Sequence, residues 1–232
     1  MRETTDHLFQ RFEVNASGHD YVVGDIHGRF DLLERGMAVV RFNPERDRMF
    51  SVGDLVDRGP RSDEAVDWIL RPWFHAVRGN HEQMCIESDP GMHLCNGGGW
   101  FLALSDEKQA TTRAVFDSLP IAIEVDLGDG IAGVVHAEVP GDDWPEFRAM
   151  LQNPPAIIDH IERFALWGRD VIRRRSTFGG VAGVDVVYVG HTPLEDALDV
   201  ENVRYIDTGA VFGRKLTIFN MHTGSKTCVA AF

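Results

Sequence analysis

Short runs of valine, isoleucine and aromatic residues recur along the chain, and each run stops abruptly at a polar cluster. The runs occupy residues 21–23, 49–52, 74–78, 134–135, 186–189 and 203–206, and most of the clusters that follow contain glycine together with aspartate or histidine. A short apolar run that ends at turn-forming residues is typical of a buried strand followed by a loop. The pattern therefore predicts a strand for each run, with a polar loop at its C-terminal end.

Helical spacing separates the first three runs. Apolar residues recur at helical intervals from Leu32 to Val40 and from Ala65 to Ile69, and residues 154–167 have a similar pattern. Strands that alternate with helices indicate βαβ units and a parallel core, whereas the strands after about Gly183 follow one another without helices and indicate a mixed sheet. Because ligand sites in open α/β sheets lie beyond the carboxyl ends of strands, we expect all the polar clusters at one rim.

Composition indicates a globular protein of one domain. The chain has 232 residues, 44% of them apolar, and its mean hydropathy is -0.18. We expect residues 1–232 to form a single domain, with residues 1–19 as an N-terminal lead segment. No apolar stretch approaches the roughly 18 residues of a membrane span, and no signal peptide is visible. The three cysteines are an odd number without CxxC spacing, which favours a reducing compartment, the cytoplasm.

The charge balance limits the classes of partner. The 36 acidic and 23 basic side chains give a formal net charge of -13. Nucleic-acid binders neutralise phosphates with lysine and arginine, so this charge argues against a nucleic-acid partner. The total charge taken alone also argues against a phosphate-bearing substrate.

The polar clusters contain six residues that can bind a metal ion. They combine carboxylate and amide oxygens with imidazole nitrogens and include no thiolate: Asp25, His27, Asp54, Asn80, His136 and His191. Such a set suits Mn, Fe, Co or Zn better than Ca or a structural zinc–thiolate site. Any one of them alone is more typical of a helix cap, a turn or a core histidine. Together they suffice for two ions about 4 Å apart that share a bridging carboxylate.

Three motifs carry a resemblance to a known family. Residues 24–28 are GDIHG, residues 53–59 are GDLVDRG and residues 79–82 are GNHE. This combination resembles the phosphoprotein phosphatase family of metallophosphoesterases, and VHA at 135–137, VGHTP at 189–193 and IDTGAVFG at 206–213 extend the resemblance over nearly the whole chain after residue 20. The length and the segment NGGGWF at 96–101 look most like the bacterial and phage serine/threonine phosphatases. The resemblance implies the calcineurin-like α/β sandwich, with mixed sheets flanked by helices and a dimetal site at the C-terminal ends of strands.

The resemblance also implies a role for each metal-binding residue. Asp25 and His27 would hold the first ion and Asp54 would bridge the two. The second ion would be held by Asn80, His136 and His191. A hydroxide between the ions would attack the phosphorus directly. Mn is the preferred metal, with Fe, Zn and Co as alternatives.

Four further residues would act on the substrate. His81 would be the general acid that protonates the leaving group, and Asp57 would orient its imidazole. Arg58 and Arg169 would bind the phosphate oxygens. A turn-stabilising salt bridge for Arg58 and a plain surface position for Arg169 stay open as alternatives.

Other segments have weaker interpretations. GDGIAG at 128–133 matches a dinucleotide-binding fingerprint, but residues 131–135 look like a strand where the fingerprint needs a helix, so we expect a hairpin turn at Asp129-Gly130. Residues 96–99 predict a mobile active-site loop, and the arginines at 173–175 predict a solvated face or a docking patch for acidic phosphopeptides. Glu82 and Asp207 are expected to support the ligands or the fold rather than bind the metal.

Together these features predict a metal-dependent serine/threonine protein phosphatase that acts on phosphoproteins or phosphopeptides. A dinucleoside polyphosphate hydrolase with the same motifs is the first alternative, and a non-catalytic phosphoprotein-binding module is the second. Two dications would place four positive charges at one rim of the sheet, so the overall acidity does not exclude a phosphate substrate. The physiological substrate and the oligomeric state are not predicted.

Overall fold

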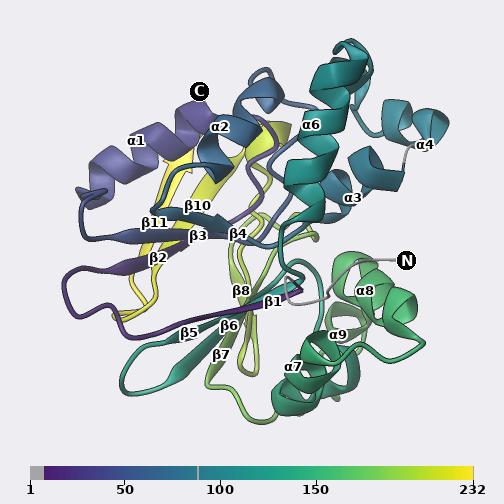
Figure 1. The fold of residues 1–232 in the computed structure, drawn as a ribbon. Coiled ribbons are helices and arrows are strands. Elements are labelled where there is room, and N and C mark those ends of the chain that lie inside the picture. The colour runs from purple at the N-terminus through teal and green to yellow at the C-terminus, as the bar shows by residue number, and fades with distance from the viewer. Residues whose placement is uncertain (1–7, 88, 232) are drawn as a thin grey trace.

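Two mixed β-sheets pack face to face, and helices cover the outer face of each (Figure 1). The computed structural model describes residues 8–87 and 89–231. The first sheet contains, in spatial order, β11 (Lys226–Ala230), β10 (Lys215–Asn220), β2 (Asp20–Val23), β3 (Arg48–Ser51) and β4 (Phe74–Ala76). The second contains β1 (Phe9–Phe12), β5 (Ala122–Asp126), β6 (Ile131–Val135), β7 (Val186–Val189), β9 (Val203–Tyr205) and β8 (Leu198–Val200). This architecture confirms the α/β sandwich of mixed sheets.

Each sheet contains three parallel strands that carry the motif loops. In the first sheet β2, β3 and β4 run parallel, and in the second β6, β7 and β9 do the same. β5 and β6 form the expected antiparallel hairpin around Asp129-Gly130, with Asp126 opposite Ile131. The one expected rim is therefore shared by two sheets, and the carboxyl ends of six strands supply its loops.

Three hydrophobic clusters hold the layers together. Val22, Phe50, Ile123, Val134 and Tyr188 belong to the cluster between the sheets, because alternate residues of each strand point to opposite faces. Their sequence neighbours point outward into two further clusters, one on each outer face. Strands buried on both faces need continuous apolar runs, which explains the pattern in the sequence.

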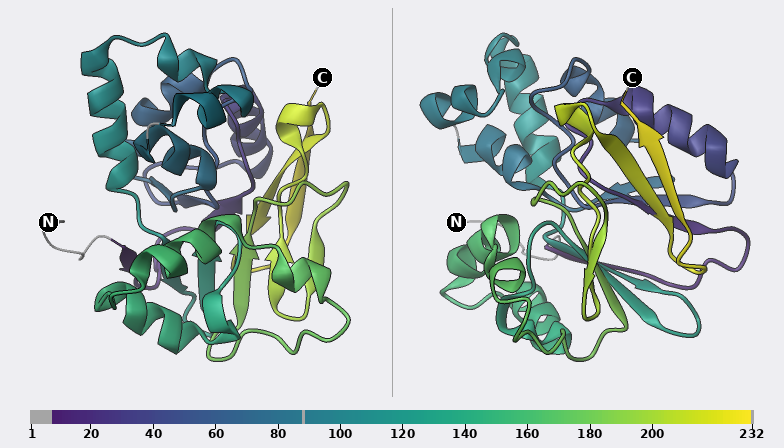
Figure 2. Two further views of the ribbon diagram at one scale, coloured as in Figure 1. Left: turned by 90° about the vertical axis from the view of Figure 1, so that its right-hand side faces the viewer. Right: turned by 180° about the vertical axis from the view of Figure 1, so that it is seen from behind.

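The helices are divided between the two outer faces (Figure 2). The face of the first sheet packs against α1 (Phe30–Val40), α2 (Ala65–Ile69) and the α3 (Asn80–Glu87) and α6 (Asp106–Asp117) pair. Between α3 and α6 lie two short helices, α4 (Pro90–Cys95) and α5 (Gly99–Leu102). The second sheet is covered by α7 (Trp144–Gln152), α8 (Ile158–Trp167) and α9 (Asp170–Arg173). No helix in the described ranges is long and apolar enough to cross a membrane.

Two local expectations need correction, and a third is refined. The lead segment 1–19 contains a strand, since β1 pairs in parallel with β5 and Arg11 donates to Glu124 at 2.6 Å; its residues 1–7 lie outside the described part of the chain. This strand depends on a partner more than 100 positions away, so local pattern does not reveal it. The helix expected over 154–167 begins at Ile158, after two prolines. The loop expected at 96–99 is a turn at 96–98 between α4 and α5, and its mobility stays a prediction.

The loops after β2 and β3 are joined backbone to backbone. The amides of Ile26 and His27 both donate to the carbonyl of Asp54, at 3.1 and 2.8 Å, and Gly28 donates to Leu55 at 2.7 Å. The approach is so close that a Cβ at Gly59 would lie 1.8 Å from the carbonyl oxygen of His27. Only glycine fits at this position, and the close contact keeps the first two motifs in register.

Gly59→Ala is expected to lower the free energy of unfolding by about 1–3 kcal/mol, because the added methyl group has to push the two loops apart. Gly179→Ala is the matched control, since a Cβ there would have no atom within 4 Å. That control should be neutral or stabilise by up to about 1 kcal/mol. Urea unfolding of both variants measures the difference, and equal stabilities would contradict the close packing of the two loops.

Candidate active site

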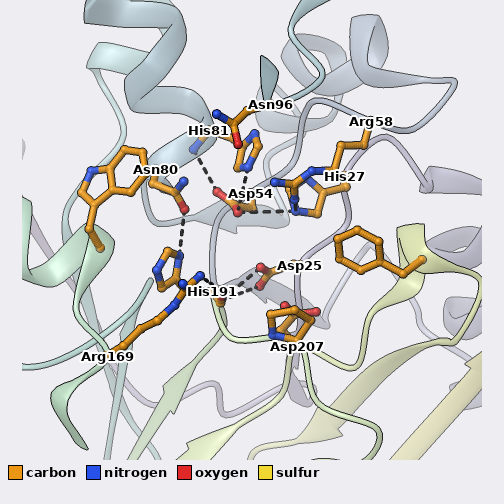
Figure 3. Close-up of a pocket in the computed structure, with 13 residues that line it drawn as sticks. Asp25, His27, Asp54, Arg58, Asn80, His81, Asn96, Arg169, His191 and Asp207 are labelled. Carbon is orange, nitrogen blue, oxygen red and sulfur yellow. Dashed lines mark hydrogen bonds and ion pairs between the residues drawn. The ribbon is translucent and has the colours of Figure 1, made fainter. Parts of the chain in front are cut away.

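A cavity of about 380 Å³ lies where the strand ends of the two sheets meet (Figure 3). Its walls carry residues from the loops after β2, β3, β4, β7 and β9 together with the turn before α5 and the α8–α9 connection. Nine of the ten residues predicted for the site lie on or beside this cavity, and the tenth, Asp57, is buried behind His81. The lining residues are Asp25, His27, Asp54, Arg58, Asn80, His81, Asn96, Trp167, Arg169, His191, Pro193, Asp207 and Phe212.

Backbone strain is concentrated at this cavity. Eight described non-glycine residues have a positive φ, and more than half of them belong to the predicted site: His27, Asp54, Asp57, Arg58 and His191. Side chains disfavour this left-handed region, so such residues persist only where surrounding contacts hold them. The unfavourable backbone conformations are thus concentrated in the loops that contain the sequence motifs.

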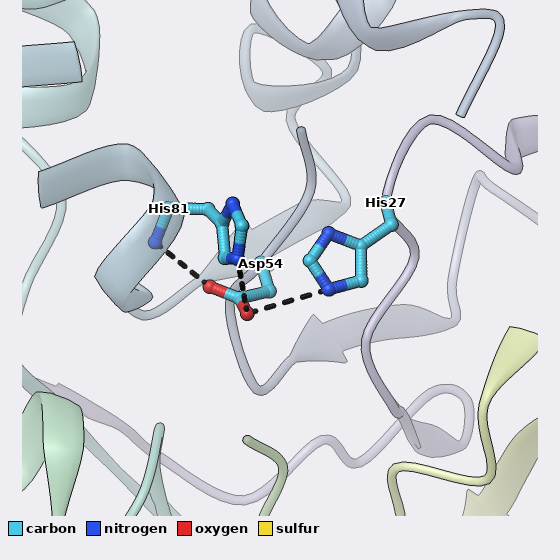
Figure 4. Close-up of side chains that lie close together, drawn as sticks. All are labelled: His27, Asp54 and His81. Atoms are coloured by element: carbon cyan, nitrogen blue, oxygen red, sulfur yellow. Dashed lines mark hydrogen bonds and ion pairs between the residues drawn. The ribbon is translucent and has the colours of Figure 1, made fainter. Parts of the chain in front are cut away.

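The two carboxylate oxygens of Asp54 face different histidines, of which Figure 4 shows His27 beside Oδ2. Oδ2 lies 3.5 Å from Nε2 of His27, and Oδ1 lies 3.4 Å from Nε2 of His136. The Oδ1 atom also accepts the backbone N–H of His81 at 3.0 Å. Asp54 is thus placed between two donor groups, as a bridging carboxylate has to be.

Asn80 gathers the second donor group. Its Oδ1 lies 2.8 Å from Nε2 of His136 and 2.9 Å from Nδ1 of His191. Asn80 is the first residue of α3, directly after β4 and Gly79, and this junction turns its side chain into the cavity. His136 and His191 come from the ends of β6 and β7, so both sheets contribute to one cluster.

Backbone carbonyls orient two of the imidazoles. Nδ1 of His27 donates to the carbonyl of Val56 and Nδ1 of His136 to that of Val52, both at 2.7 Å. Each bond leaves the Nε2 lone pair directed toward Asp54, which is how metal-binding histidines are commonly held. Burial lowers the pKa of His27 to about 4, and burial with the charge of His136 lowers that of His191 to about 3. Burial also lowers the pKa of His136, so all three imidazoles are neutral, as ligands must be.

Asp25 and Asp207 form a buried acidic pair on the opposite wall. The oxygens of Asp25 lie 3.0 and 3.3 Å from the backbone nitrogen of His191, which donates to them. Burial and the charges of Asp207 and Asp54 raise the pKa of Asp25 well above its usual value, and burial raises that of Asp207 to about 6. The sequence suggested that Asp207 was only a supporting residue, but the structure places it in the lining of the cavity.

His81 differs from the other three histidines. Its Nδ1 donates to Oδ2 of Asp57 at 2.6 Å, and its Nε2 lies 3.9 Å from Oδ2 of Asp54. Burial works to lower its pKa, but the charge of Asp54 and the bond to Asp57 outweigh burial and raise it above the usual value. Burial alone would raise the pKa of Asp57, but the hydrogen bonds from His81 and His93 outweigh burial and hold that pKa below its usual value. The pair is thus arranged to keep a proton on His81 and none on Asp57.

Two arginines stand at the mouth of the cavity. Arg58 is exposed, donates to Nε2 of His27 at 2.8 Å and lies over the ring of Phe212 at 5.5 Å. Among the described residues no carboxylate lies within ion-pair distance of Arg58, so the structure does not support the salt-bridge alternative. Arg169 is also exposed, and its guanidinium lies 3.4 Å from the carbonyl oxygen of His191.

Sequence reasoning missed two residues beside the site. His93 and Trp100 both contact the carboxylate of Asp57; Trp100 lies in the segment 96–101, for which no such contact was predicted, and His93 lies in none of the quoted motifs. They flank the glycine-rich turn at 96–98, so the one available signal was that unusual cluster. The local sequence pattern could not show which way the side chains of His93 and Trp100 point, because α4 and α5 are short and mostly exposed.

The donor atoms fit two divalent cations. Two ligands at about 2.1 Å from one ion are about 3.0–3.4 Å apart in octahedral or tetrahedral coordination. The nitrogen and oxygen pairs around Asp54 and Asn80 are separated by 2.8, 2.9, 3.4 and 3.5 Å. His27 with Asp54, and His136 with His191 and Asp54, form two clusters whose shared member is Asp54. His81 is also a member of the first cluster, but its Nδ1 is occupied by Asp57 and its Nε2 is farther from Asp54 than that of His27, at 3.9 against 3.5 Å.

Glu82 holds the loop that presents Asp54. Its Oε2 accepts the amides of Asp54 and Gly79 at 2.9 and 2.8 Å, and its Oε1 accepts that of Leu55 at 2.8 Å. Burial and the charge of Asp54 raise the pKa of Glu82 to about 7. The GNHE motif thus ends in a residue that fastens the second motif to the third.

Glu82→Gln is expected to lower the free energy of unfolding by about 1–3 kcal/mol, because an amide cannot accept all three N–H groups and leaves one buried donor unpaired. Glu87→Gln, on the exposed end of the same helix, should change it by less than about 0.5 kcal/mol. Urea unfolding of the two variants tests this. A Glu82→Gln variant as stable as the control would show that these bonds do not hold the loop.

Comparison with known proteins agrees with this site. Residues 21–195 match the calcineurin-like phosphoesterase family. The chain is 39% identical to serine/threonine-protein phosphatase 1 of Salmonella typhimurium (strain LT2), over 92% of this chain and 96% of that protein. It is 30% identical to serine/threonine-protein phosphatase 2 of Escherichia coli (strain K12), over 92% and 97% of the two chains.

Other similarities are either low in sequence identity or limited to part of the chain. The structure of a protein serine/threonine phosphatase from Saccharomyces cerevisiae has a TM-score of 0.67 to this chain and covers 98% of it and 85% of its own length, at 16% identity, which shows the shared fold alone. A symmetrical bis(5'-nucleosyl)-tetraphosphatase of Serratia proteamaculans (strain 568) is 42% identical over 64 residues, only 27% of this chain and 23% of its own. The chain therefore belongs to the calcineurin-like phosphoesterase family, and within it to the phosphoprotein phosphatase group that includes these bacterial serine/threonine-protein phosphatases.

Proposed function

We propose that this protein is a metal-dependent phosphatase that hydrolyses phosphoserine and phosphothreonine in proteins. The observation that carries the proposal is the full-length similarity to the two bacterial serine/threonine-protein phosphatases, combined with one cavity that brings the three sequence motifs together. A binding module would have no need to retain a general acid and its carboxylate partner in a strained, buried arrangement. This arrangement favours an enzyme over the non-catalytic alternative.

Two divalent cations are proposed to bind at the two donor clusters. Asp25 and His27 would hold one cation, and Asn80, His136 and His191 would hold the other. Asp54 would lie between the two cations. Such ions polarise phosphoryl oxygens and lower the pKa of bound water toward neutrality. The mixed oxygen and nitrogen donors support manganese, and iron, zinc and cobalt suit the same set.

His81 is proposed to protonate the leaving group. As the bond between phosphorus and the serine or threonine oxygen breaks, the Nε2 proton of His81 moves to that oxygen, and Asp57 stays ionised beside Nδ1. Its raised pKa distinguishes His81 from the three ligand histidines, whose pKa values are lowered. This contrast supports separate roles for the two kinds of histidine.

Arg58 and Arg169 are proposed to hold the phosphate from opposite sides of the cavity. Both are exposed and both line it, and planar guanidinium groups suit bidentate contacts to phosphate oxygens. Their contacts are with uncharged groups: Arg58 with His27 and Phe212, and Arg169 with a carbonyl. An arriving phosphate would therefore break no strong ion pair of either arginine.

Two further expectations stay predictions. The cytoplasmic location rests on the three cysteines, none of which forms a disulfide. A docking role for the arginines at 173–175 gains little support, since Arg174 already pairs with Asp142 at 2.6 Å.

A comparison of substrates tests the proposed function. With Mn²⁺ present, kcat/KM for a phosphoserine peptide should exceed that for diadenosine tetraphosphate, because over most of the chain the identity is 39% and 30% to the two serine/threonine-protein phosphatases and 25% to the tetraphosphatases. Removal of the metal with a chelator should abolish both activities, and added Mn²⁺ should restore them. A clear preference for the dinucleotide would replace the proposal with the tetraphosphatase function, and inactivity toward both would revive the binding module.

His81→Asn should reduce kcat for the phosphoserine peptide by roughly 10²–10⁴-fold, the usual contribution of a general acid. The loss should be much smaller for p-nitrophenyl phosphate, whose leaving group needs no protonation. Calorimetric Mn²⁺ titration should give unchanged stoichiometry. A variant that no longer binds two ions would show that His81 is a ligand rather than the acid.

A further inference from the structure

Two residues besides His81 contact the carboxylate of Asp57 through ring nitrogens: Trp100 and His93. Nδ1 of His81 donates to Oδ2 at 2.6 Å, and the indole Nε1 of Trp100 donates to Oδ1 at 2.6 Å. Nε2 of His93 lies 3.0 Å from both oxygens. Asp57 is completely buried, so three N–H donors take the place of water around one carboxylate.

Two of these donors belong to one short segment. His93 lies on α4 and Trp100 on α5, with the turn at 96–98 between them; we call residues 93–100 the clamp segment. The same segment also touches the backbone beside Asp57, since a Cβ at Gly97 would lie 2.6 Å from the backbone nitrogen of Arg58. The clamp segment therefore contacts both the side chain of Asp57 and the residue that follows it.

The backbone under this contact is strained. Asp57 and Arg58 are consecutive residues with φ values of 72° and 67°. Each left-handed residue of this kind costs free energy, and a pair of them persists only when neighbouring groups hold it in place. The side-chain bonds of Asp57 are the interactions in the right place to do so.

We propose that Trp100 and His93 are positioning residues for the general acid. They fix the Asp57 carboxylate so that Oδ2 faces Nδ1 of His81, and this orientation directs Nε2 of His81 into the cavity. An indole N–H is always a donor, so Trp100 holds Oδ1 and leaves Oδ2 for His81. The inference rests on the proposed function, because it describes how that reaction's acid is held.

Neither residue reaches the reacting atoms in this arrangement. Neither Trp100 nor His93 lines the cavity; both act on His81 only through Asp57. Their effect should therefore appear in the protonation of the leaving group and should be absent where Asp57 itself is absent. This separates a positioning role from a general contribution to folding.

Trp100→Phe tests the inference, because it keeps an aromatic ring and removes the N–H. We expect kcat for the phosphoserine peptide to fall about 10-fold, the effect of losing one hydrogen bond to a charged group, with little change in KM. The loss for p-nitrophenyl phosphate should be markedly smaller. In an Asp57→Asn background the same substitution should have no further effect on either substrate, as a double-mutant cycle measures.

Trp73→Phe is the matched control. Like Trp100, Trp73 is partly buried against the hydrophobic cluster on the outer face of the first sheet, but it contacts no site residue, so its replacement should leave both activities unchanged. If Trp100→Phe is too unstable to assay, the His93 pair gives the same test. His93→Gln keeps an amide donor and should retain most of the activity, whereas His93→Leu should lose activity mainly toward the phosphoserine peptide.

The outcomes distinguish this inference from the proposed function. If the wild-type protein hydrolyses neither substrate, the proposed function itself fails. If the wild-type protein is active and His81→Asn shows its dependence on the leaving group, the function stands. A Trp100→Phe variant that then loses nothing, loses both activities equally, or still loses activity in the Asp57→Asn background would overturn the positioning role alone.

Discussion

The site depends on burying carboxylates close together. Asp25, Asp54 and Asp207 are almost inaccessible to water, the charges of Asp207 and Asp54 disfavour ionisation of Asp25, and the charge of Asp54 disfavours that of Asp207. Buried charges of one sign need partners, which nearby cations supply most directly. Asp54 satisfies part of this need through the histidines around it, and its pKa stays below the usual value although burial alone would raise it. This requirement accounts for both the metal-binding chemistry and the strained loops that deliver it.

The sandwich meets this requirement by bringing the strand ends of two sheets to one place. The first sheet supplies Asp25, Asp54 and Asn80, and the second supplies His136 and His191. Hydrogen bonds between the loop backbones, and the three amides whose N–H groups Glu82 accepts, hold the first-sheet residues of the site in register. Rigid strands thereby position residues whose own conformations are unfavourable.

The same cavity separates two uses of histidine. Nδ1 of His27 and Nδ1 of His136 each donate to a backbone carbonyl, whereas Nδ1 of His81 donates to a buried carboxylate. A neutral carbonyl leaves the imidazole unprotonated, and an anionic partner stabilises its protonated form. The pKa values follow this difference: those of His27 and His136 are lowered and that of His81 is raised, which is the basis of the separate roles proposed for them.

The sequence by itself indicated the motif-bearing strands, the polar loops at their ends and a set of candidate site residues, because those features depend on local patterns and on contiguous motifs. Asp25, His27, Asp54, Asn80, His136 and His191 were all identifiable at strand ends. Only the tertiary structure showed that two sheets share the rim, that β1 joins the second sheet, and that Asp207 lines the cavity. It alone placed His93 and Trp100 on Asp57, since contacts across 36 and 43 positions leave no periodic signal in a sequence. Local patterns record which way a strand or helix faces, whereas the partners of a buried carboxylate are set by how distant segments pack.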